Sequence, residues 1–327
     1  MRRSLRALAL AAALATLALA APTQSHALVV GLGDQKPDTF TDPLFKQLKV
    51  KRTRYIVPWD AINDPAQRAI ADAWFTAARR HRPRLEIVVA FNLSASQNCP
   101  AAPCSYPSVS RYRTAVRKFH RRYGRHVKIY QPWNESNSGT QPTSSRGKRG
   151  RAGKRQAARG ARQVAKYYKV LVRIAGRRRI VTGADIQDIG DFVGYTRTFL
   201  RAVGRRKPKV MGFHNYTDTN RRRTSATQKF VRAMPRGTKV WLTETGALYK
   251  FIQQNGTVSL PPSESRARRS MTHMFRIARK FRRHIDRIYV YQWKALETDR
   301  FDAGVVNPDG TRRSSYTVLR RNRKFIR

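Results

Sequence analysis

Acidic residues are scarce in this sequence. Asp and Glu together number 19 against 68 Lys and Arg, which gives a formal net charge of +49. A surface of this charge favours anionic partners, such as an acidic polysaccharide, a phosphate polymer of the cell envelope or a nucleic acid. The alternative is an arginine-rich composition that is spread over solvent-facing helices and serves no such partner.

Several kinds of functional site have no signal in the sequence. The seven histidines show no metal-ligand spacing, and there is neither a glycine-rich phosphate loop nor a nucleophile-elbow serine. We therefore expect no metal ion and no cofactor. After the N-terminal region, no stretch approaches the roughly 18 apolar residues of a membrane helix.

The N-terminal residues have the pattern of a secretory signal peptide. Three arginines precede an apolar run from Ala7 to Ala21, and Ser25-His26-Ala27 offers a cleavage site with small residues. We expect residues 1–27 to be removed, with cleavage after Ala20 or Ala21 as the alternative. Residues 28–327 would then form a single domain that is secreted or associated with the cell envelope.

Cysteine is limited to Cys99 and Cys104. In an exported protein, a disulfide that closes this short loop is the expected state. A metal site is the alternative, but two thiols without a nearby histidine make a poor one.

Eight apolar runs of strand length are present after the signal segment, and most neighbouring runs are separated by a stretch with helical spacing. Strands that alternate with helices indicate an α/β fold with a parallel sheet. Eight units in roughly 300 residues fit a (β/α)8 barrel (TIM barrel). A doubly wound open sheet is the alternative, but Gly31-Leu32-Gly33-Asp34-Gln35 lacks the third glycine of its usual first turn. The eight runs are Leu28–Leu32, Tyr55–Pro58, Leu85–Phe91, Val127–Gln131, Ile180–Ala184, Val210–His214, Val240–Thr243 and Ile288–Trp293.

The segments after the third, fourth and seventh runs are longer than the others. They contain the cysteine loop, Ser136–Arg162 and Tyr249–Ser265. Loops that follow strands lie on the catalytic face of a barrel, so this extra length is expected to form the walls of a cleft. The glycines of Ser136–Arg162 predict a loop up to about Arg155, and its basic part, residues 146–162, would lie beside Glu135. Binding an anionic substrate and tethering the protein to the envelope are both open as its role.

Only five residues are glutamates, and two of them, Glu135 and Glu244, lie at or just after the end of a predicted strand. Two carboxylates can hydrolyse a glycosidic bond when one donates a proton to the leaving oxygen and the other attacks the anomeric carbon. In retaining enzymes they lie about 5–5.5 Å apart. The alternative is a pair of ordinary barrel-rim residues in ion pairs with the abundant arginines.

Asn134-Glu135 at the end of a fourth strand and Glu244 at the end of a seventh resemble the pattern of the clan A glycoside hydrolases, which are retaining (β/α)8 enzymes. The order of elements extends the resemblance over most of the chain after residue 27. It implies that Glu135 is the general acid/base and Glu244 the nucleophile. The chain departs from the larger families of the clan at Ser136, where a proline often follows the acid/base.

The resemblance also implies roles for supporting residues. Arg54, at the start of the second strand, matches an arginine beside the nucleophile, where a fixed cation keeps Glu244 ionised. Either His214 or Tyr216, at the end of the sixth strand, would be hydrogen-bonded to the nucleophile. Asn134 would donate to the sugar hydroxyl next to the anomeric carbon.

Three further residues are candidates for lining the cleft. Trp293, at the end of the last strand, resembles the aromatic platform on which a sugar ring stacks. Trp59 and Asn92 follow the second and third strands. Packing in the core is the alternative role for a tryptophan, and it stays open for Trp59.

The sequence therefore predicts a secreted, retaining glycoside hydrolase that cleaves a β-linked polysaccharide or glycoside by double displacement. An anionic glycan is one option, because Arg52, Lys294 and the basic loop add positive charge to this face. The alternative is a non-catalytic barrel that binds an acidic envelope polymer or nucleic acid. Nucleic-acid binding is not the expected function, since no dedicated motif is present.

Overall fold

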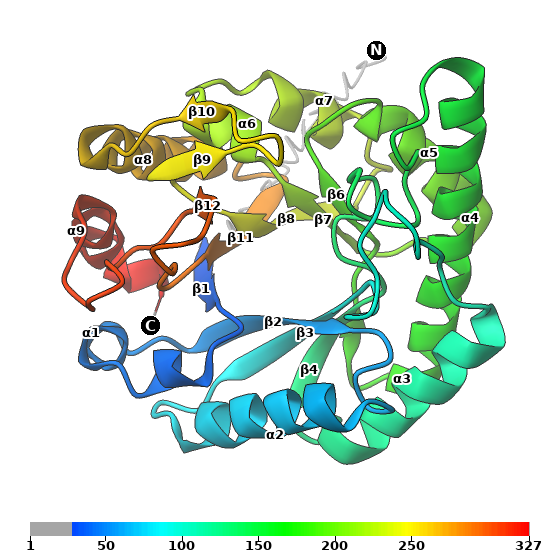
Figure 1. Ribbon diagram of the computed structural model, residues 1–327, viewed down its shortest axis with the longest axis horizontal. Helices are drawn as coiled ribbons and strands as arrows, with labels where there is room; N and C mark the ends of the chain where they lie inside the picture. The colour runs from blue at the N-terminus through cyan, green and yellow to red at the C-terminus, as the bar shows by residue number, and fades with distance from the viewer. Residues whose placement is uncertain (1–27, 327) are drawn as a thin grey trace, which may run out of the picture.

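A parallel sheet closes on itself at the centre of the protein. The computed structural model describes residues 28–326, and its strands follow the order β5-β4-β3-β2-β1-β11-β8-β7-β6 (Figure 1). β5 (Ile180–Val181) pairs with β4, whereas β6 (Asp185–Gln187) pairs with β7. These two short strands are consecutive pieces of one interrupted strand, so the ring has eight strand positions. The predicted (β/α)8 barrel is confirmed, and the predicted signal segment lies outside the described residues.

The other seven positions in the barrel also agree with the predicted runs. β2 begins three residues earlier than expected, because its first residues, Arg52-Thr53-Arg54, are not apolar. β11 also begins three residues earlier than expected, and it ends at Tyr291 instead of Trp293. The seven strands are β1 (Val29–Gly33), β2 (Arg52–Pro58), β3 (Glu86–Asn92), β4 (Val127–Gln131), β7 (Val210–His214), β8 (Lys239–Thr245) and β11 (Ile285–Tyr291).

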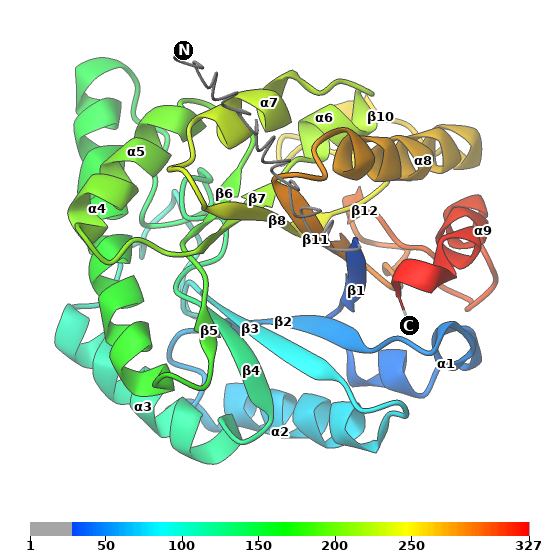
Figure 2. The same ribbon diagram turned by 180° about the vertical axis from the view of Figure 1, so that it is seen from behind.

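Helices surround the barrel on its outer side (Figures 1 and 2). α2 illustrates how they are fixed: Asp64 caps its first amides, Pro65 begins it, and Trp74 stacks on Tyr55 of β2 with ring centroids 4.2 Å apart. None of the helices in residues 28–326 is long and apolar enough to cross a membrane. The helices are η1 (Pro37–Phe40), α1 (Pro43–Leu48), α2 (Pro65–Arg80), α3 (Val109–Tyr123), α4 (Gly150–Ala175), α5 (Phe192–Val203), α6 (Tyr216–Asn220), α7 (Ser225–Arg232), α8 (Glu264–Lys280), α9 (Ser314–Arg321) and η2 (Arg323–Phe325).

α4 begins earlier than the sequence indicates. We expected a loop up to about Arg155, but the helix starts at Gly150, so this prediction is wrong. The glycines permit close packing of the preceding segment against the helix. A Cβ atom on Gly160 would lie 1.6 Å from the Thr143 carbonyl oxygen, and one on Gly153 would lie 2.2 Å from that of Lys148.

A small antiparallel sheet adds to the barrel and was not predicted. It has the order β10 (Val258–Leu260), β9 (Lys250–Ile252) and β12 (Phe301–Asp302). Strands of two or three residues are too short to give a periodic signal. The sheet joins the long segment after β8 to the segment after β11, and so orders both.

Candidate active site

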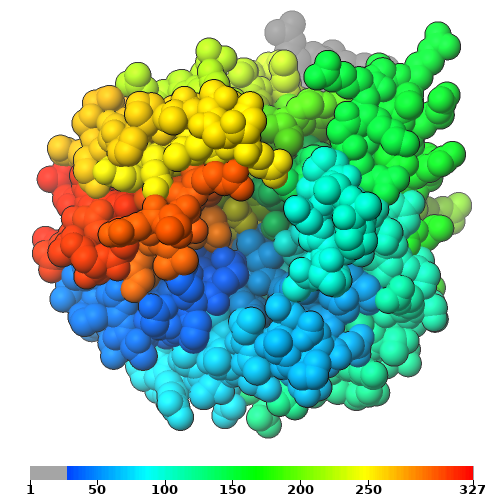
Figure 3. All heavy atoms as spheres, in the orientation of Figure 1, coloured from blue at the N-terminus to red at the C-terminus, as the bar shows by residue number. Residues whose placement is uncertain are grey.

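A cavity of about 620 Å³ opens at the carboxyl ends of the barrel strands. Figure 3 shows it as a hollow near the middle of the molecule, bordered by blue, cyan and orange segments. The segments after β3, β4 and β8 contribute to its wall, as their lengths predicted, and the segment after β11 adds Phe301. Cys99 also lines it and forms the predicted disulfide with Cys104.

Glu135 and Glu244 meet in this cavity. A carboxylate oxygen of Glu135 and one of Glu244 lie within 4.8 Å of each other. Glu244, on β8, is 6% exposed, and Glu135 in the turn after β4 is half-buried. Glu135 and Glu244 are 109 positions apart in the sequence and lie at the ends of different strands, yet both face the same sugar-sized space.

The turn that carries Glu135 has an unusual backbone. Glu135 has a φ of 42°, in the left-handed region that non-glycine residues rarely adopt. Such a conformation costs on the order of 1–2 kcal/mol and is one of the strained backbone geometries that cluster at active sites. Hydrogen bonds hold it: the Ser136 amide donates to the Asp185 carbonyl at 3.0 Å, and the Ser138 amide donates to the Glu135 carbonyl at 2.8 Å.

The buried Arg54 links Glu244 to polar residues of other barrel strands. It is 1% exposed, and its Nη1 donates to Glu244 Oε2 at 2.8 Å. Its Nη2 donates to Asp185 Oδ2 at 3.0 Å, and its Nε donates to Gln131 Oε1 at 2.6 Å. The predicted position of Arg54 beside Glu244 agrees with this geometry. Asp185 and Gln131 were not predicted, because a single buried Asp or Gln in a strand has no distinctive spacing.

Asn134 is oriented by the same guanidinium. Its Oδ1 accepts from Arg54 Nη2 at 2.6 Å. Because arginine has donors only, the amide oxygen must be the atom that faces Arg54. The amide nitrogen therefore points elsewhere, and since Asn134 lines the cavity this donor is placed to reach a ligand.

His214 and Tyr216 contact the two carboxylates differently. The Tyr216 hydroxyl donates to Glu244 Oε1 at 3.0 Å. His214 Nδ1 lies 3.0 Å from Glu135 Oε1 and 4.0 Å from Glu244 Oε2. Of the two candidates for the hydrogen bond to Glu244, Tyr216 makes it, while His214 bonds to Glu135 and lies between the carboxylates.

In Glu244 and His214, burial and the neighbouring charges shift the pKa in opposite directions. Burial raises the pKa of Glu244 above its ordinary value, while His214 and Arg54 beside it act to lower it. Burial disfavours charge on His214, but the carboxylates of Glu244 and Glu135 outweigh this effect and raise the pKa of His214. Burial and the charge of Glu244 raise the pKa of Tyr216 well above its usual range, so its hydroxyl stays a donor.

Two predicted lining residues do not reach the cavity. Trp293 is completely buried, its Nε1 donates to Asp42 Oδ2 at 2.9 Å, and its ring packs edge-on against Phe45. Trp59 is 5% exposed and also lies outside the cavity lining. The predicted sugar platform at Trp293 is therefore wrong, because α1 covers the ring.

Other aromatic residues line the cavity instead. Phe251, Tyr291 and Phe301 do so, and the Phe251 and Phe301 rings are 5.8 Å apart on the small sheet. Asn92 lines the cavity as predicted.

The predicted basic loop does not form the wall next to Glu135. The segment after β4 contributes Ser138, Thr140 and Gln141 to the cavity, and these side chains are uncharged. Among the described residues that line the cavity there is no Lys or Arg, because the basic residues after position 148 belong to α4 or its approach.

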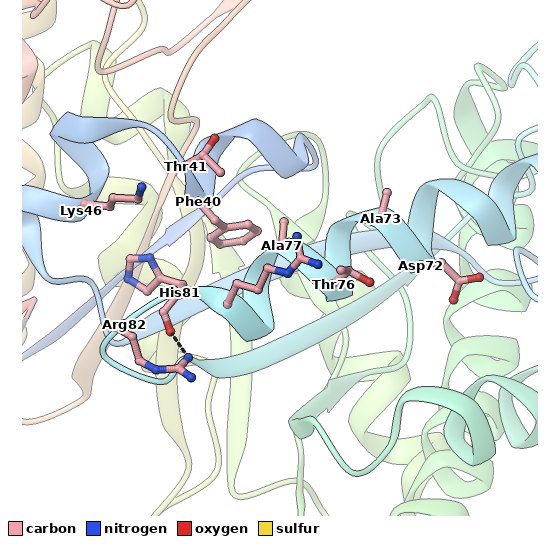
Figure 4. Close-up of a pocket in the computed structure, with 10 residues that line it drawn as sticks. Phe40, Thr41, Lys46, Asp72, Ala73, Thr76, Ala77, His81 and Arg82 are labelled. Atoms are coloured by element: carbon pink, nitrogen blue, oxygen red, sulfur yellow. Dashed lines mark hydrogen bonds between the residues drawn. The ribbon is translucent and has the colours of Figure 1, made fainter.

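A larger cavity, about 710 Å³, lies along α2 and has no pair of carboxylates (Figure 4). Its one acidic lining residue, Asp72, accepts hydrogen bonds from Arg122 and Tyr123. Phe40 and Ala77 make much of its wall apolar. The chemistry of a paired acid and nucleophile is thus available at the barrel mouth and not in this cavity.

Three side chains that could each ligate a metal ion converge at the barrel mouth, namely Glu135, His214 and Glu244. The Arg54 guanidinium lies 2.8 Å from Glu244 and opposes the binding of a metal cation there.

Residues 133–311, more than half of the chain, match the family model described as glycosyl hydrolase catalytic core. The chain belongs to this family, and it is a glycoside hydrolase. The resemblance to clan A glycoside hydrolases that the sequence motifs indicated is confirmed. No curated protein matches this sequence.

Solved structures share the fold. An endo-1,4-β-xylanase from Caldicellulosiruptor owensensis superposes with a TM-score of 0.61 at 10% identity, covering 90% of this chain and 97% of that chain. A family 1 β-glucosidase from Thermotoga maritima gives a TM-score of 0.56 at 10% identity, covering 91% of this chain and 98% of that chain. At 10% identity, these two comparisons support a shared barrel fold and order of elements, and no more than that.

Proposed function

We propose that the protein hydrolyses a β-linked glycoside with retention of configuration, using Glu135 as general acid/base and Glu244 as nucleophile. The observation that carries this proposal is the carboxylate separation, within 4.8 Å between oxygens. Retaining enzymes need about 5–5.5 Å between the carboxyl groups, whereas inverting enzymes need about 6.5–9.5 Å to admit a water.

In the first step, the Glu135 carboxyl gives its proton to the glycosidic oxygen as the bond from that oxygen to the anomeric carbon breaks. A Glu244 oxygen forms a bond to the same carbon and yields a glycosyl ester. In the second step, Glu135, now a carboxylate, takes a proton from a water. That water attacks the anomeric carbon, and Glu244 leaves as a carboxylate.

The surrounding side chains fit these roles. Arg54 and Tyr216 each donate to a different oxygen of Glu244, which fixes the carboxylate and disperses its charge. His214 holds Glu135 at 3.0 Å. The amide nitrogen of Asn134 is placed to donate to the hydroxyl beside the anomeric carbon, a contact that strengthens in the transition state.

The cavity supports a neutral sugar next to the two glutamates. Its wall combines aromatic rings with amide side chains, which stack on sugar rings and hydrogen-bond their hydroxyls. The two solved structures named above are, by their names, enzymes for β-linked substrates. Any acidic groups of an anionic glycan would be bound outside this cavity, where the basic residues are. The amide residues are Gln35, Asn92, Gln97, Asn98, Asn134, Gln141 and Gln187.

We also propose that the protein acts outside the cell or in the envelope, on the basis of the signal pattern in residues 1–27. The sequence left open a non-catalytic barrel that binds an acidic polymer or nucleic acid, for which the net charge of +49 was the argument, and the match to the glycosyl hydrolase family excludes it. Such a barrel has no use for two carboxylates held within 4.8 Å of each other by buried donors.

Azide rescue tests the assignment of Glu135. On an aryl β-glycoside with a good leaving group, Glu135→Ala should form the glycosyl-enzyme but release it slowly. Added azide, which needs no general base, should restore turnover and give a β-glycosyl azide. Formation of the α-azide, or full hydrolysis by Glu135→Ala without azide, would contradict the assignment.

A further inference from the structure

A continuous row of basic side chains runs along α4. Its six members recur every three or four residues, and each is exposed. This spacing keeps side chains on one face of a helix, so they form a single row. At 1.5 Å per residue the row extends about 27 Å, with one positive charge about every 5 Å. The members, called the α4 row below, are Arg155, Arg159, Arg162, Lys166, Lys169 and Arg173.

Acidic side chains do not neutralise the α4 row. α4 contains no Asp or Glu, and within residues 28–326 none of the six side chains forms an ion pair. Like charges at this spacing destabilise a helix. Elsewhere the chain does pair its arginines, for example Arg122 of α3 with Asp72 and Arg287 of β11 with Glu86.

The geometry points to a linear acidic polysaccharide with about one carboxylate or sulfate per sugar as the partner of the α4 row. A charge about every 5 Å is close to the length of one sugar unit in such a chain. Duplex DNA carries a phosphate about every 1.7 Å along its axis, both strands counted, and this denser spacing fits the row less well.

Two further features favour a polysaccharide over a nucleic acid. Tyr167 and Tyr168, the aromatic residues of α4, are buried, so the row offers no ring on which bases could stack. α4 also packs between α3 and α5 on the wall of the barrel (Figures 1 and 2). A helix held in this way is not free to enter a major groove about 12 Å wide.

The α4 row is separate from the catalytic cavity but starts near it. Lys154, one residue before the row, lines a cavity of about 510 Å³ together with Asn137 and Gly139, which follow Glu135. None of the six residues lines the cavity of the two glutamates. An acidic chain on the row therefore holds the enzyme on its matrix while the cleft stays open for a neutral sugar.

Charge-matched variants test the inference. The α4 variant carries R155Q, R159Q, R162Q and K166Q, and the control carries R268Q, R269Q, R276Q and R279Q on α8, all exposed. Both lose four positive charges, and α8 lies on the opposite side of the barrel (Figure 1). The probe is fluorescent polygalacturonate, whose affinity is measured by anisotropy at several salt concentrations.

The α4 variant should bind polygalacturonate at least about tenfold more weakly than the control. Its slope of log affinity against log salt should also fall by roughly three, since each of the four lost contacts removes about 0.7 unit, as on a single polyanion strand. Equal losses in the two variants would overturn the inference in favour of net charge alone. Tighter binding of a single-stranded oligonucleotide than of polygalacturonate by the unmodified protein would overturn the choice of partner.

A circular dichroism melt of both variants checks that they fold. Hydrolysis of a small aryl glycoside should be unchanged in both, because the substituted residues lie outside the catalytic cavity. The binding assay does not depend on hydrolysis, so a failure of the proposed reaction and a failure of the α4 row are distinguishable.

Discussion

Arg54 Nη2 lies 3.0 Å from Asp185 Oδ2, while Nη1 of the same guanidinium lies 2.8 Å from Glu244 Oε2. One buried cation is thus shared between the carboxylate proposed as nucleophile and a second carboxylate that does not line the cavity. Asp185 is completely buried and also accepts from Gln131 at 2.6 Å and from Thr243 at 2.7 Å. Because Arg54 also pairs with Asp185, it attracts Glu244 less strongly than it would if Glu244 were its only acidic partner.

The first prediction concerns Asp185→Asn. Without the negative charge of Asp185, Arg54 is attracted to Glu244 alone, which lowers the pKa of Glu244. The nucleophile then stays ionised to lower pH, so the acidic limb of the kcat/KM profile should shift to lower pH. The maximal rate should fall roughly tenfold, because a more strongly paired carboxylate attacks less readily. An unchanged acidic limb would show that Asp185 does not act through Arg54.

The second prediction concerns His214→Asn and has the opposite sign. His214 is the charge that most lowers the pKa of Glu244 against the effect of burial. Removing it should raise the pKa of Glu244 further, so that the nucleophile is protonated at a higher pH. The acidic limb of kcat/KM should therefore move to higher pH than in the unmodified enzyme. A shift in the same direction as that of Asp185→Asn would contradict the charge balance described here.

The third prediction concerns Gly212 on β7. A Cβ atom there would lie 1.8 Å from Asp185 Oδ1 and 2.7 Å from Thr243 Oγ1. Gly212→Ala should destabilise the protein by roughly 1–3 kcal/mol, as overpacking of a core does, and displace the carboxylate beneath Arg54. Gly139→Ala is the matched control, because nothing lies within 4 Å of its Cβ position. Urea unfolding of both variants checks the difference, and equal stability would refute it.

The fourth prediction concerns Tyr216→Phe, which removes the hydroxyl that donates to Glu244 Oε1. A hydrogen bond to a charged group contributes about 1.5–3 kcal/mol, so kcat/KM should fall about tenfold to a hundredfold. Tyr195→Phe is a suitable control, since Tyr195 donates to the Thr143 carbonyl and not to a carboxylate. Comparable losses from both substitutions would indicate a general packing effect.

Much of the fold could be predicted because the barrel strands are buried on both faces and read as continuous apolar runs. The catalytic pair was also visible, since Glu135 and Glu244 stand at strand ends in a chain with few acids. Arg54 was found only through the family pattern, because one arginine among so many has no signal of its own.

The remainder depends on packing that sequence patterns do not encode. Asp185 and Gln131 become neighbours of Arg54 only once the barrel has closed. Trp293 lies two residues after the end of β11, and its contacts with Asp42 and Phe45 turn its ring into the interior instead of toward a sugar. The glycines of α4 are typical of a loop, yet here they make room for a neighbouring segment.

Trapping of the glycosyl-enzyme is the most direct test of the central claim. A 2-fluoro β-glycoside with an activated leaving group slows the second step more than the first, so a covalent ester accumulates. Intact mass measurement should show one added fluoroglycosyl group, and peptide mapping should place it on Glu244. A label on any other residue would contradict the proposed mechanism. Hydrolysis of the parent glycoside with inversion of configuration, and without any covalent adduct, would also contradict it.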